Sequence, residues 1–328
     1  MTERLRWGIL GTGWIADQMT ADLDVLGSPV TAVGSRAQHT ADDFAGRHGI
    51  PRAHASYQAL VDDPEVDVIY VATPHPSHAA DARLALEAGK HVLVEKSFTV
   101  NAAEAQELAD LAADRGLVVL EAMWTRWLPH MVRIRELIAG GALGEVRTLI
   151  ADHTQKLSDD PAHRIQNLEL GGGALLDLGI YPVSFAWDVF GAPRTISAIS
   201  SPTATGADRQ TAMLFGYADG QQAVMQCALD TRGPNAAVLL GTEARIEIDG
   251  IWYAPTRFRL IAPDDTVLEE FAERPPGRGM QFQAEALEEL VAAGALAGEV
   301  LPPSESVAIM ASLDEVRRQI GLRYPSEG

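Results

Sequence analysis

A glycine-rich turn directly after the first apolar run constrains this chain more than any other feature. The segment Gly8-Ile-Leu-Gly11-Thr-Gly13-Trp-Ile-Ala16 follows the strand-like run Leu5–Leu10 and opens a helical pattern. Gly11 permits a tight turn, Gly13 lets a ligand approach the backbone, and Ala16 lets the helix pack closely on the strand. Because a helix N-terminus also favours phosphate groups, the spacing predicts a dinucleotide site. The expected cofactor contacts are Gly11, Thr12, Gly13, Trp14 and Ile15.

The first third of the chain alternates short apolar runs with helical patterns. Strands are expected at Leu5–Leu10, Val30–Gly34, Val66–Ala72, His91–Glu95 and Leu117–Glu121. Helices are expected at Trp14–Leu26, Thr40–His48, Tyr57–Asp62, Ser77–Ala88 and Asn101–Arg115, with Ser77 and Asn101 as N-caps. Strands that alternate with helices of this length indicate a doubly wound parallel sheet.

The pattern changes after about residue 123. Strands then follow one another, at Glu145–His153, Thr195–Ser200, Gln210–Ala218, Gln221–Leu229, Ala236–Gly241, Ala244–Asp249 and Arg257–Ala262. Helices are expected at Pro129–Ala139, about Ala174–Phe190, Gln281–Ala293 and Ser304–Ile320. Successive strands without helices between them indicate a mainly antiparallel sheet. We therefore expect an α/β protein with a nucleotide-binding domain at 1–123 and a second domain at 124–328, whose last helices can pack back on the first.

The end of the second expected strand bears on the choice of cofactor. A site for NAD usually carries an acidic residue there, which binds the ribose 2′-hydroxyl. This strand instead ends in Ser35-Arg36, with His39 close behind. A guanidinium and a hydroxyl suit a 2′-phosphate, so we expect NADP rather than NAD. The alternative is that Arg36 is an ordinary surface charge.

Two further strand ends carry polar residues. Ligands of open parallel sheets bind at the carboxyl ends of the strands. The fourth strand ends there in Thr73, Pro74, His75 and His78, and the fifth ends in Glu95 and Lys96. We expect these residues to contact the cofactor and Lys96 to lie near the reacting atoms. A solvated ion pair is the alternative for Glu95 and Lys96, and a structural role is the alternative for His78.

A third segment lies in the second domain. Gly171-Gly-Gly precedes Asp177 and Tyr181, which are four residues apart and therefore share a face of a regular helix. The alternative for Tyr181 is a core tyrosine whose hydroxyl is satisfied locally.

Composition excludes several classes of function. The net charge of −19 disfavours nucleic acid as a partner. The single cysteine permits neither an internal disulfide nor a cysteine-based metal site, which fits a cytoplasmic protein. The nine histidines show no zinc-type spacing, so no metal is expected. The charged first residues form no apolar signal segment, and no apolar run approaches the roughly 20 residues of a membrane helix.

Taken in order, these segments resemble the glucose–fructose oxidoreductase / inositol dehydrogenase family. The motifs Trp7–Ala16, Glu121–Trp127 and Gly171–Tyr181 are similar to its dihydrodiol dehydrogenase and NADP-dependent D-xylose dehydrogenase subgroups. The resemblance implies a Rossmann domain followed by an α/β domain whose large open sheet forms a homodimer or homotetramer interface.

The resemblance also implies residue roles. Lys96 and Tyr181 would perform acid–base catalysis together with Asp177, while Trp124, Arg126, Arg164 and Asp177 would contact the substrate. A free tyrosine, with a pKa of about 10, is a poor base at neutral pH, and a nearby ammonium would favour its phenolate. One departure concerns Lys96: the family's Glu-Lys-Pro is Glu95-Lys96-Ser97 here, which leaves the placement of this lysine open.

The function implied is an NADP-dependent dehydrogenase of a sugar or vicinal diol. Two alternatives stay open. One is a sugar-ketone reductase or another polyol dehydrogenase, and the other is a non-catalytic NADP-binding sensor. A sensor would not need Lys96 and Tyr181 together.

Overall fold

The computed structural model describes residues 4–327, which belong to two compact units. Among the described residues, the first unit consists of 4–124 with 276–310, and the second of 125–275 with 311–327. Residues 276–310, which lie within the expected 124–328 domain, are thus part of the first unit. No helix among residues 4–327 has the length and apolar character needed to cross a membrane.

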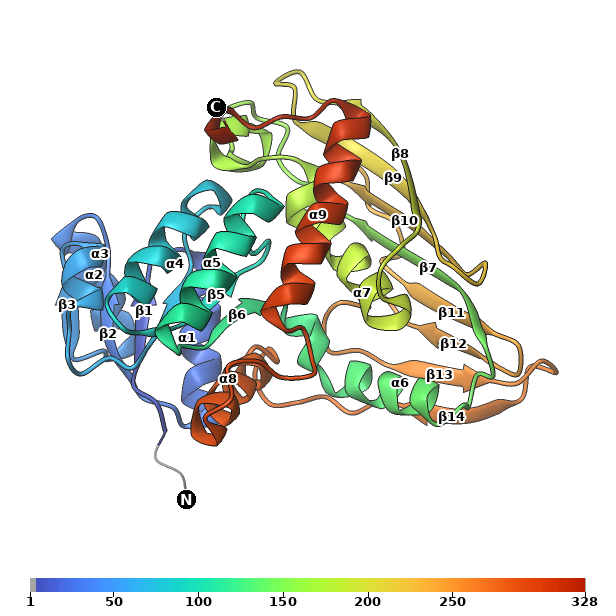
Figure 1. Ribbon diagram of the computed structural model, residues 1–328, viewed down its shortest axis with the longest axis horizontal. Coiled ribbons are helices and arrows are strands. Elements are labelled where there is room, and N and C mark those ends of the chain that lie inside the picture. The colour runs from blue at the N-terminus through green and yellow to red at the C-terminus, as the bar shows by residue number, and fades with distance from the viewer. Residues whose placement is uncertain (1–3, 328) are drawn as a thin grey trace. The chain divides into compact units, whose positions relative to one another are not determined.

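The first unit is built on a six-stranded parallel sheet with the strand order β3-β2-β1-β4-β5-β6 (Figure 1). Its strands are β1 (Trp7–Leu10), β2 (Val30–Gly34), β3 (Arg52–His54), β4 (Val68–Val71), β5 (His91–Glu95) and β6 (Val119–Ala122). The side chains of β1 and β4 are fully buried because helices cover both faces of the sheet. The expected doubly wound sheet is confirmed.

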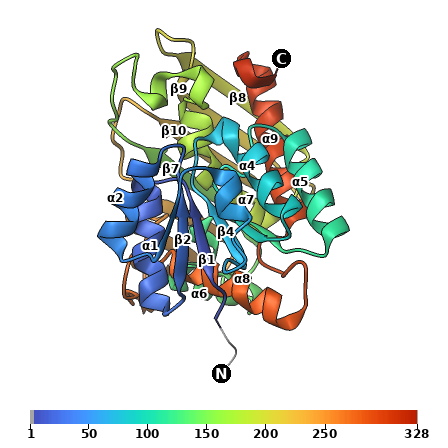
Figure 2. The same cartoon turned by 90° about the vertical axis from the view of Figure 1, so that its left-hand side faces the viewer.

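Helices cover this sheet on two sides, with α1 and α2 on one side and α4 and α5 on the other (Figure 2). The helices between the strands are α1 (Trp14–Leu26), α2 (Gln38–His48), α3 (Tyr57–Val61), α4 (His78–Glu87) and α5 (Ala102–Arg115). The unit also contains α8 (Gln281–Ala293), which packs on α1, and the first part of α9 (Pro303–Ile320).

The second unit contains an eight-stranded sheet with the order β14-β13-β12-β11-β7-β10-β9-β8. Its strands are β7 (Val146–Thr154), β8 (Thr195–Pro202), β9 (Asp208–Gly216), β10 (Gln222–Ala228), β11 (Ala237–Gly241), β12 (Arg245–Ile248), β13 (Phe258–Ile261) and β14 (Val267–Phe271). All neighbouring strands are antiparallel except β7 and β10, which pair in parallel. The expected mainly antiparallel sheet is confirmed.

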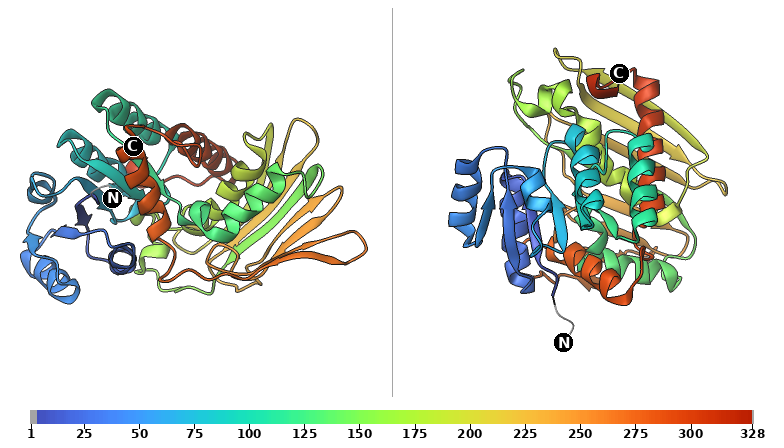
Figure 3. Two further views of the ribbon diagram at one scale, coloured as in Figure 1. Left: turned by 90° about the horizontal axis from the view of Figure 1, so that it is seen from below. Right: turned by 60° about the vertical axis from the view of Figure 1, so that its left-hand side comes forward.

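The helices α6 (Pro129–Ala139) and α7 (Ile180–Phe190) lie on one face of this sheet (Figure 3). The opposite face carries no helix among the described residues. Under α7, Phe185 stacks on the fully buried Trp252 at 5.3 Å between ring centroids. The indole N–H of Trp252 donates to the carbonyl oxygen of Asp152 on β7. These contacts place the core of the unit between α7 and the sheet.

The structure corrects three local expectations. Ser77 does not cap α4 with its side chain, because a 3₁₀ turn (His75–Ser77) precedes the helix and holds Ser77 in a helical conformation. The segment expected as one helix from Ala174 begins with a π-helical turn at Leu175–Gly179, and α7 follows it. The edge strands β3 and β14 were not expected from the sequence.

Candidate active site

The glycine-rich turn between β1 and α1 has the form that a dinucleotide pyrophosphate requires. Gly11 has a φ of +104°, and a Cβ at this position would lie 3.0 Å from the carbonyl oxygen of Ala72. Gly13 is exposed, and a Cβ built there would have no atom within 4 Å. It also caps α1 without a side-chain hydrogen bond, so no side chain covers the helix N-terminus from this position. The turn and the helix end therefore fit a phosphate ligand.

At the end of β2, Ser35 and Arg36 differ in their exposure. The buried Ser35 shares a hydrogen bond of 2.6 Å between its Oγ and the Oγ1 of Thr40, while Arg36 and His39 are exposed. Burial raises the pKa of Asp81, and its hydrogen bond from Thr73 and the charge of Arg36 oppose this shift. A cationic side chain thus stands at the strand end, where the sequence predicts the 2′-phosphate.

The loops after β4 and β5 are held together by two histidines. The buried His78 lies with one ring nitrogen 2.8 Å from the carbonyl oxygen of Ser97 and the other 2.8 Å from that of Thr73. The ring of His75 lies 3.2 Å from the carbonyl oxygen of Lys96. Burial lowers the pKa of His78, and the carbonyl contacts oppose this shift. The structure therefore brings together the residues expected after these two strands.

Lys96 follows β5 directly, and its side chain is half-buried. Glu95 accepts a hydrogen bond from the hydroxyl of Tyr70 and another, of 3.2 Å, from the backbone N–H of Lys96. The Lys96–Ser97 peptide bond is cis. This backbone leads into a loop whose carbonyl oxygens face the two histidines.

A buried carboxylate fastens the other side of the same loop. Glu121 on β6 accepts from the backbone N–H of Phe98 at 3.1 Å and from the hydroxyl of Ser306 at 2.7 Å. The sequence pattern placed Glu121 at the end of an expected strand and in a family motif, and gave it no role of its own. Its position in an otherwise apolar strand is the signal that points to a buried anchoring role.

In the second unit, Asp177 lies on the π-helical turn and pairs with Arg164. Nη2 of Arg164 is 3.3 Å from Oδ2 of Asp177, and Asp177 is 8% exposed. The turn is anchored by Asp208, whose Oδ2 accepts from the backbone N–H of Leu175 at 2.8 Å and from Thr211 at 2.9 Å. The sequence pattern did not single out Asp208, because it stands in the polar stretch Asp208-Arg-Gln-Thr211 at the start of β9.

Tyr181, at the start of α7, belongs to an aromatic cluster that sequence reasoning did not anticipate. His153 stacks on Tyr253 at 3.7 Å between ring centroids, and Tyr181 lies 4.9 Å from His153 and 5.2 Å from Tyr253. Gln155 contacts the ring of His153 at 2.9 Å. Burial raises the pKa of Tyr253, and the neighbouring Tyr181 adds to this shift. Two rings that carry polar atoms, those of His153 and Tyr253, thus lie next to the expected catalytic tyrosine.

Two of the expected substrate residues are largely buried. Arg126 lies with its guanidinium against α7, where it donates to the hydroxyl and the carbonyl oxygen of Ser184 and pairs with Asp188 at 3.0 Å. These contacts give Arg126 a role in holding α7. Trp124, at the end of the first unit, is 5% exposed.

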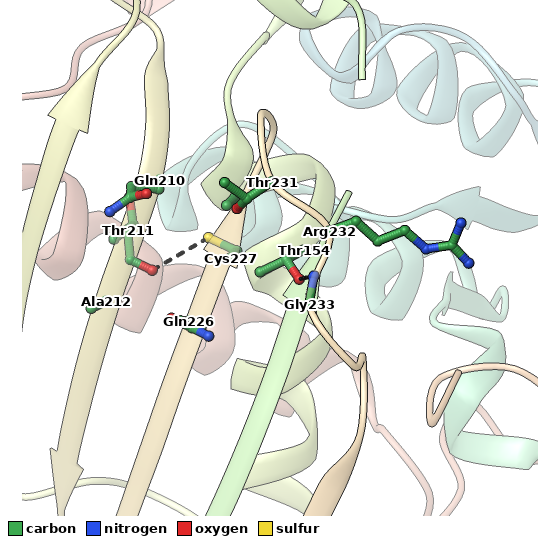
Figure 4. A pocket seen from close by; sticks show the side chains of 10 residues that line it. Thr154, Gln210, Thr211, Ala212, Gln226, Cys227, Thr231, Arg232 and Gly233 are labelled. Carbon is green, nitrogen blue, oxygen red and sulfur yellow. Dashed lines mark hydrogen bonds between the residues drawn. The ribbon is translucent and has the colours of Figure 1, made fainter. Parts of the chain in front are cut away.

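A separate pocket of about 160 Å³ lies in the second unit around Cys227 (Figure 4). None of the expected site residues lines it. Its lining residues are Thr154, Gln210, Thr211, Ala212, Gln226, Cys227, Ala228, Thr231, Arg232 and Gly233. Burial raises the pKa of the Cys227 thiol, so this sulfur is not an activated nucleophile. The expected catalytic and cofactor-binding residues therefore lie outside this pocket.

Comparison with known proteins identifies the family. Residues 5–123 match the oxidoreductase family with an NAD-binding Rossmann fold, and residues 131–247 match the GFO/IDH/MocA C-terminal domain. The chain is 36% identical to trans-1,2-dihydrobenzene-1,2-diol dehydrogenase from Mus musculus, covering 98% of this chain and 99% of that one. It is 34% identical to an NADP⁺-dependent D-xylose 1-dehydrogenase from Hypocrea jecorina, covering 98% and 93% of the two chains.

A solved structure is similar over the same length. A 3-ketoreductase from Actinomadura kijaniata, in complex with NADP and TDP-benzene, has a TM-score of 0.86 and 26% identity. The alignment covers 97% of this chain and 98% of that one. The matches span both units, and the glycine-rich turn lies inside the first matched region. The chain therefore belongs to the GFO/IDH/MocA oxidoreductase family.

Proposed function

We propose that this oxidoreductase is a dehydrogenase that oxidises a hydroxyl group of a sugar or a vicinal diol and prefers NADP as its cofactor. The observation that carries the proposal is the full-length likeness to two dehydrogenases, one named for a cyclic vicinal diol and one for an aldose. The two named substrates share a hydroxyl-bearing ring carbon next to another oxygenated carbon.

The cofactor preference rests on the end of β2. Ser35 and Arg36 stand where an acidic residue would bind an unphosphorylated ribose. Arg36 is exposed, so its planar guanidinium can form a bidentate pair with a phosphate group. The D-xylose dehydrogenase relative is named for NADP⁺, and the 3-ketoreductase structure contains NADP.

The cofactor, when bound, supplies the acceptor for the hydride. A residue of the chain must accept the proton of the substrate hydroxyl group. We assign removal of the hydroxyl proton to Tyr181, because its phenolate form can accept a proton as a general base. Lys96 supplies a positive charge that favours the phenolate over the phenol. Asp177, held by Arg164 at 3.3 Å, orients the hydroxyl groups of the substrate.

The reverse direction is the second candidate. The likeness to a 3-ketoreductase favours reduction of a sugar ketone by the same residues, with Tyr181 returning the proton. Oxidation and reduction would use the same catalytic residues, because the forward and reverse reactions pass through the same transition state.

We also propose that two copies of the chain associate through the uncovered face of the eight-stranded sheet. Val224 on β10 is in register with Leu214 on β9 and with Ile150 on β7, and these side chains are 44%, 45% and 46% exposed. Ile199 on β8 is 76% exposed. Exposed apolar side chains grouped on one face of a sheet are typical of a protein interface.

Replacement of Tyr181 by phenylalanine tests the assigned chemistry. Tyr181→Phe is expected to lower kcat on the best polyol substrate by about 100-fold or more, because it removes the group that exchanges the proton. The Kd for NADPH, measured by fluorescence titration, is expected to stay within about twofold of the wild-type value.

Tyr217→Phe is the matched control. The Tyr217 hydroxyl is buried and has no hydrogen-bond partner among the described residues, so its loss is expected to leave kcat unchanged. Equal kcat values for Tyr181→Phe and the wild type would remove Tyr181 from the mechanism. A parallel loss in both variants would point to a general effect on folding.

A further inference from the structure

A segment far along the chain, residues 276–281, is tied to the first helix of the nucleotide-binding unit. We call it the strap. The buried Asp22 of α1 accepts two backbone hydrogen bonds from it, one of 2.8 Å from the N–H of Arg278 and one of 2.7 Å from that of Met280. Gly277 has a φ of +70°, and a Cβ there would lie 2.5 Å from Oδ1 of Asp22. Only glycine therefore fits this close approach to the carboxylate.

The two hydrogen bonds to Asp22 fix the position of the Arg278 backbone. Its guanidinium carbon lies 4.9 Å from the ring centroid of Trp14 and 5.1 Å from that of Trp124. Trp14 is the first residue of α1, follows Gly13 directly and is 61% exposed. The positive charge thus lies over the ring of Trp14, the residue that begins the helix directly after the glycine-rich turn.

A guanidinium near the N-terminus of α1 is unfavourable for the helix when no ligand is bound. The N-terminus of a helix carries a partial positive charge, so a cation near it is repelled. An anion bound at the turn would be attracted both by the helix end and by the guanidinium. The arrangement therefore favours a negatively charged ligand at the turn.

We propose that Arg278 is a cofactor-binding residue that pairs with the pyrophosphate of the nicotinamide dinucleotide. The inference rests on the cofactor site of the first unit, and it is independent of the preference for NADP. Arg36 would recognise the 2′-phosphate, which only NADP carries. Arg278 would recognise the pyrophosphate, which NAD and NADP share.

The different phosphate groups assigned to Arg278 and Arg36 can be tested by fluorescence titration and calorimetry of the full chain. Arg278→Ala is expected to weaken binding of NADPH and of NADH by the same factor, about tenfold or more, as for a lost charged hydrogen bond. Arg36→Ala is expected to weaken NADPH and to leave NADH unchanged. Arg274→Ala, which removes an exposed charge four residues earlier, serves as the control and is expected to change neither.

Binding of 2′-AMP separates a contact from a structural effect. This nucleotide has the 2′-phosphate but no pyrophosphate, so Arg278→Ala is expected to leave its Kd unchanged while Arg36→Ala raises it. Arg278→Lys is expected to recover part of the affinity for both dinucleotides, because the charge is kept but the planar donor fork is lost.

The outcomes that overturn the proposal are distinct. Unchanged affinity of Arg278→Ala for both dinucleotides would remove Arg278 from the cofactor site, even if it changed a substrate KM. Equal weakening of 2′-AMP and NADPH would assign the effect to a disturbed α1. Absence of dinucleotide binding by the wild-type chain would overturn the cofactor site itself.

Discussion

The chemistry of single residues in this protein depends strongly on burial. Asp208 holds the π-helical turn that carries Asp177, and it is buried, with 3% of its surface exposed. Burial raises the pKa of Asp208 to about 7, and its hydrogen bonds from Thr211 and the backbone oppose this shift. Its Oδ1 has no hydrogen-bond partner among the described residues. The acid is therefore largely protonated in the folded protein below neutral pH.

This shift predicts how stability depends on pH. The unfolded chain releases the proton near pH 3.8, whereas the folded protein keeps it to about pH 7. The folded state binds more protons in this window, so stability is expected to fall as pH rises through it, by on the order of 4 kcal/mol, and to level off above pH 7. Asp208→Asn keeps the acceptor oxygen and removes the titration.

Urea unfolding at pH 5 and pH 8 measures the difference. Between these values the wild type is expected to lose more stability than Asp208→Asn, which makes the variant relatively more stable at pH 8. Parallel changes in the two proteins would show that Asp208 titrates normally.

Among the elements, those with complete local signals could be predicted and those that depend on distant partners could not. The helices α1, α6 and α8 begin and end where the sequence pattern indicates. The strand β3 consists of Arg-Ala-His and forms only because β2 offers it a partner. The parallel pairing of β7 with β10 joins strands about 70 residues apart, and no local pattern encodes it.

The same reasoning applies to the candidate site. The glycine-rich turn and Lys96 could be located because both directly follow apolar strands. His153, Tyr253 and Arg278 could not, because their contacts with Tyr181 or Trp14 form only when segments from distant parts of the sequence meet. The four-residue spacing of Asp177 and Tyr181 assumed a regular helix, and the π-helical turn replaces it there.

Helix capping provides a prediction at the scale of an element. The Asn101 side chain accepts a hydrogen bond of 2.9 Å from the N–H of Glu104 at the start of α5, whereas Ser77 makes no capping bond at α4. Asn101→Ala is expected to lower the free energy of unfolding by about 1 kcal/mol. Ser77→Ala is expected to change it by less than about 0.5 kcal/mol. Chemical denaturation compares them, and a larger loss for Ser77→Ala would contradict the capping assignment.

At the scale of the whole molecule, the uncovered face of the eight-stranded sheet predicts association. With a net charge of −19, two chains repel each other unless an apolar surface offsets the repulsion. Replacement of both Leu214 and Val224 by glutamate is expected to convert the assembly to monomers in sedimentation velocity. The Ile251→Glu variant, at an exposed position in the loop after β12, is the control and is expected to leave assembly intact.

The experiment has two informative failures. A monomeric wild-type chain would show that the sheet face has another role. An unchanged assembly in the double variant would place the interface elsewhere.

The central claim is oxidation of a hydroxyl group of a sugar or diol, with NADP as the hydride acceptor. It is tested most directly by the appearance of reduced nicotinamide when the protein is mixed with NADP or NAD and D-xylose, D-glucose, myo-inositol or a trans-dihydrodiol. We predict turnover on at least one of these compounds, with a higher kcat/KM for NADP than for NAD. No turnover with any of the four, from a protein that still binds NADPH, would contradict the claim and favour ketone reduction or a sensor.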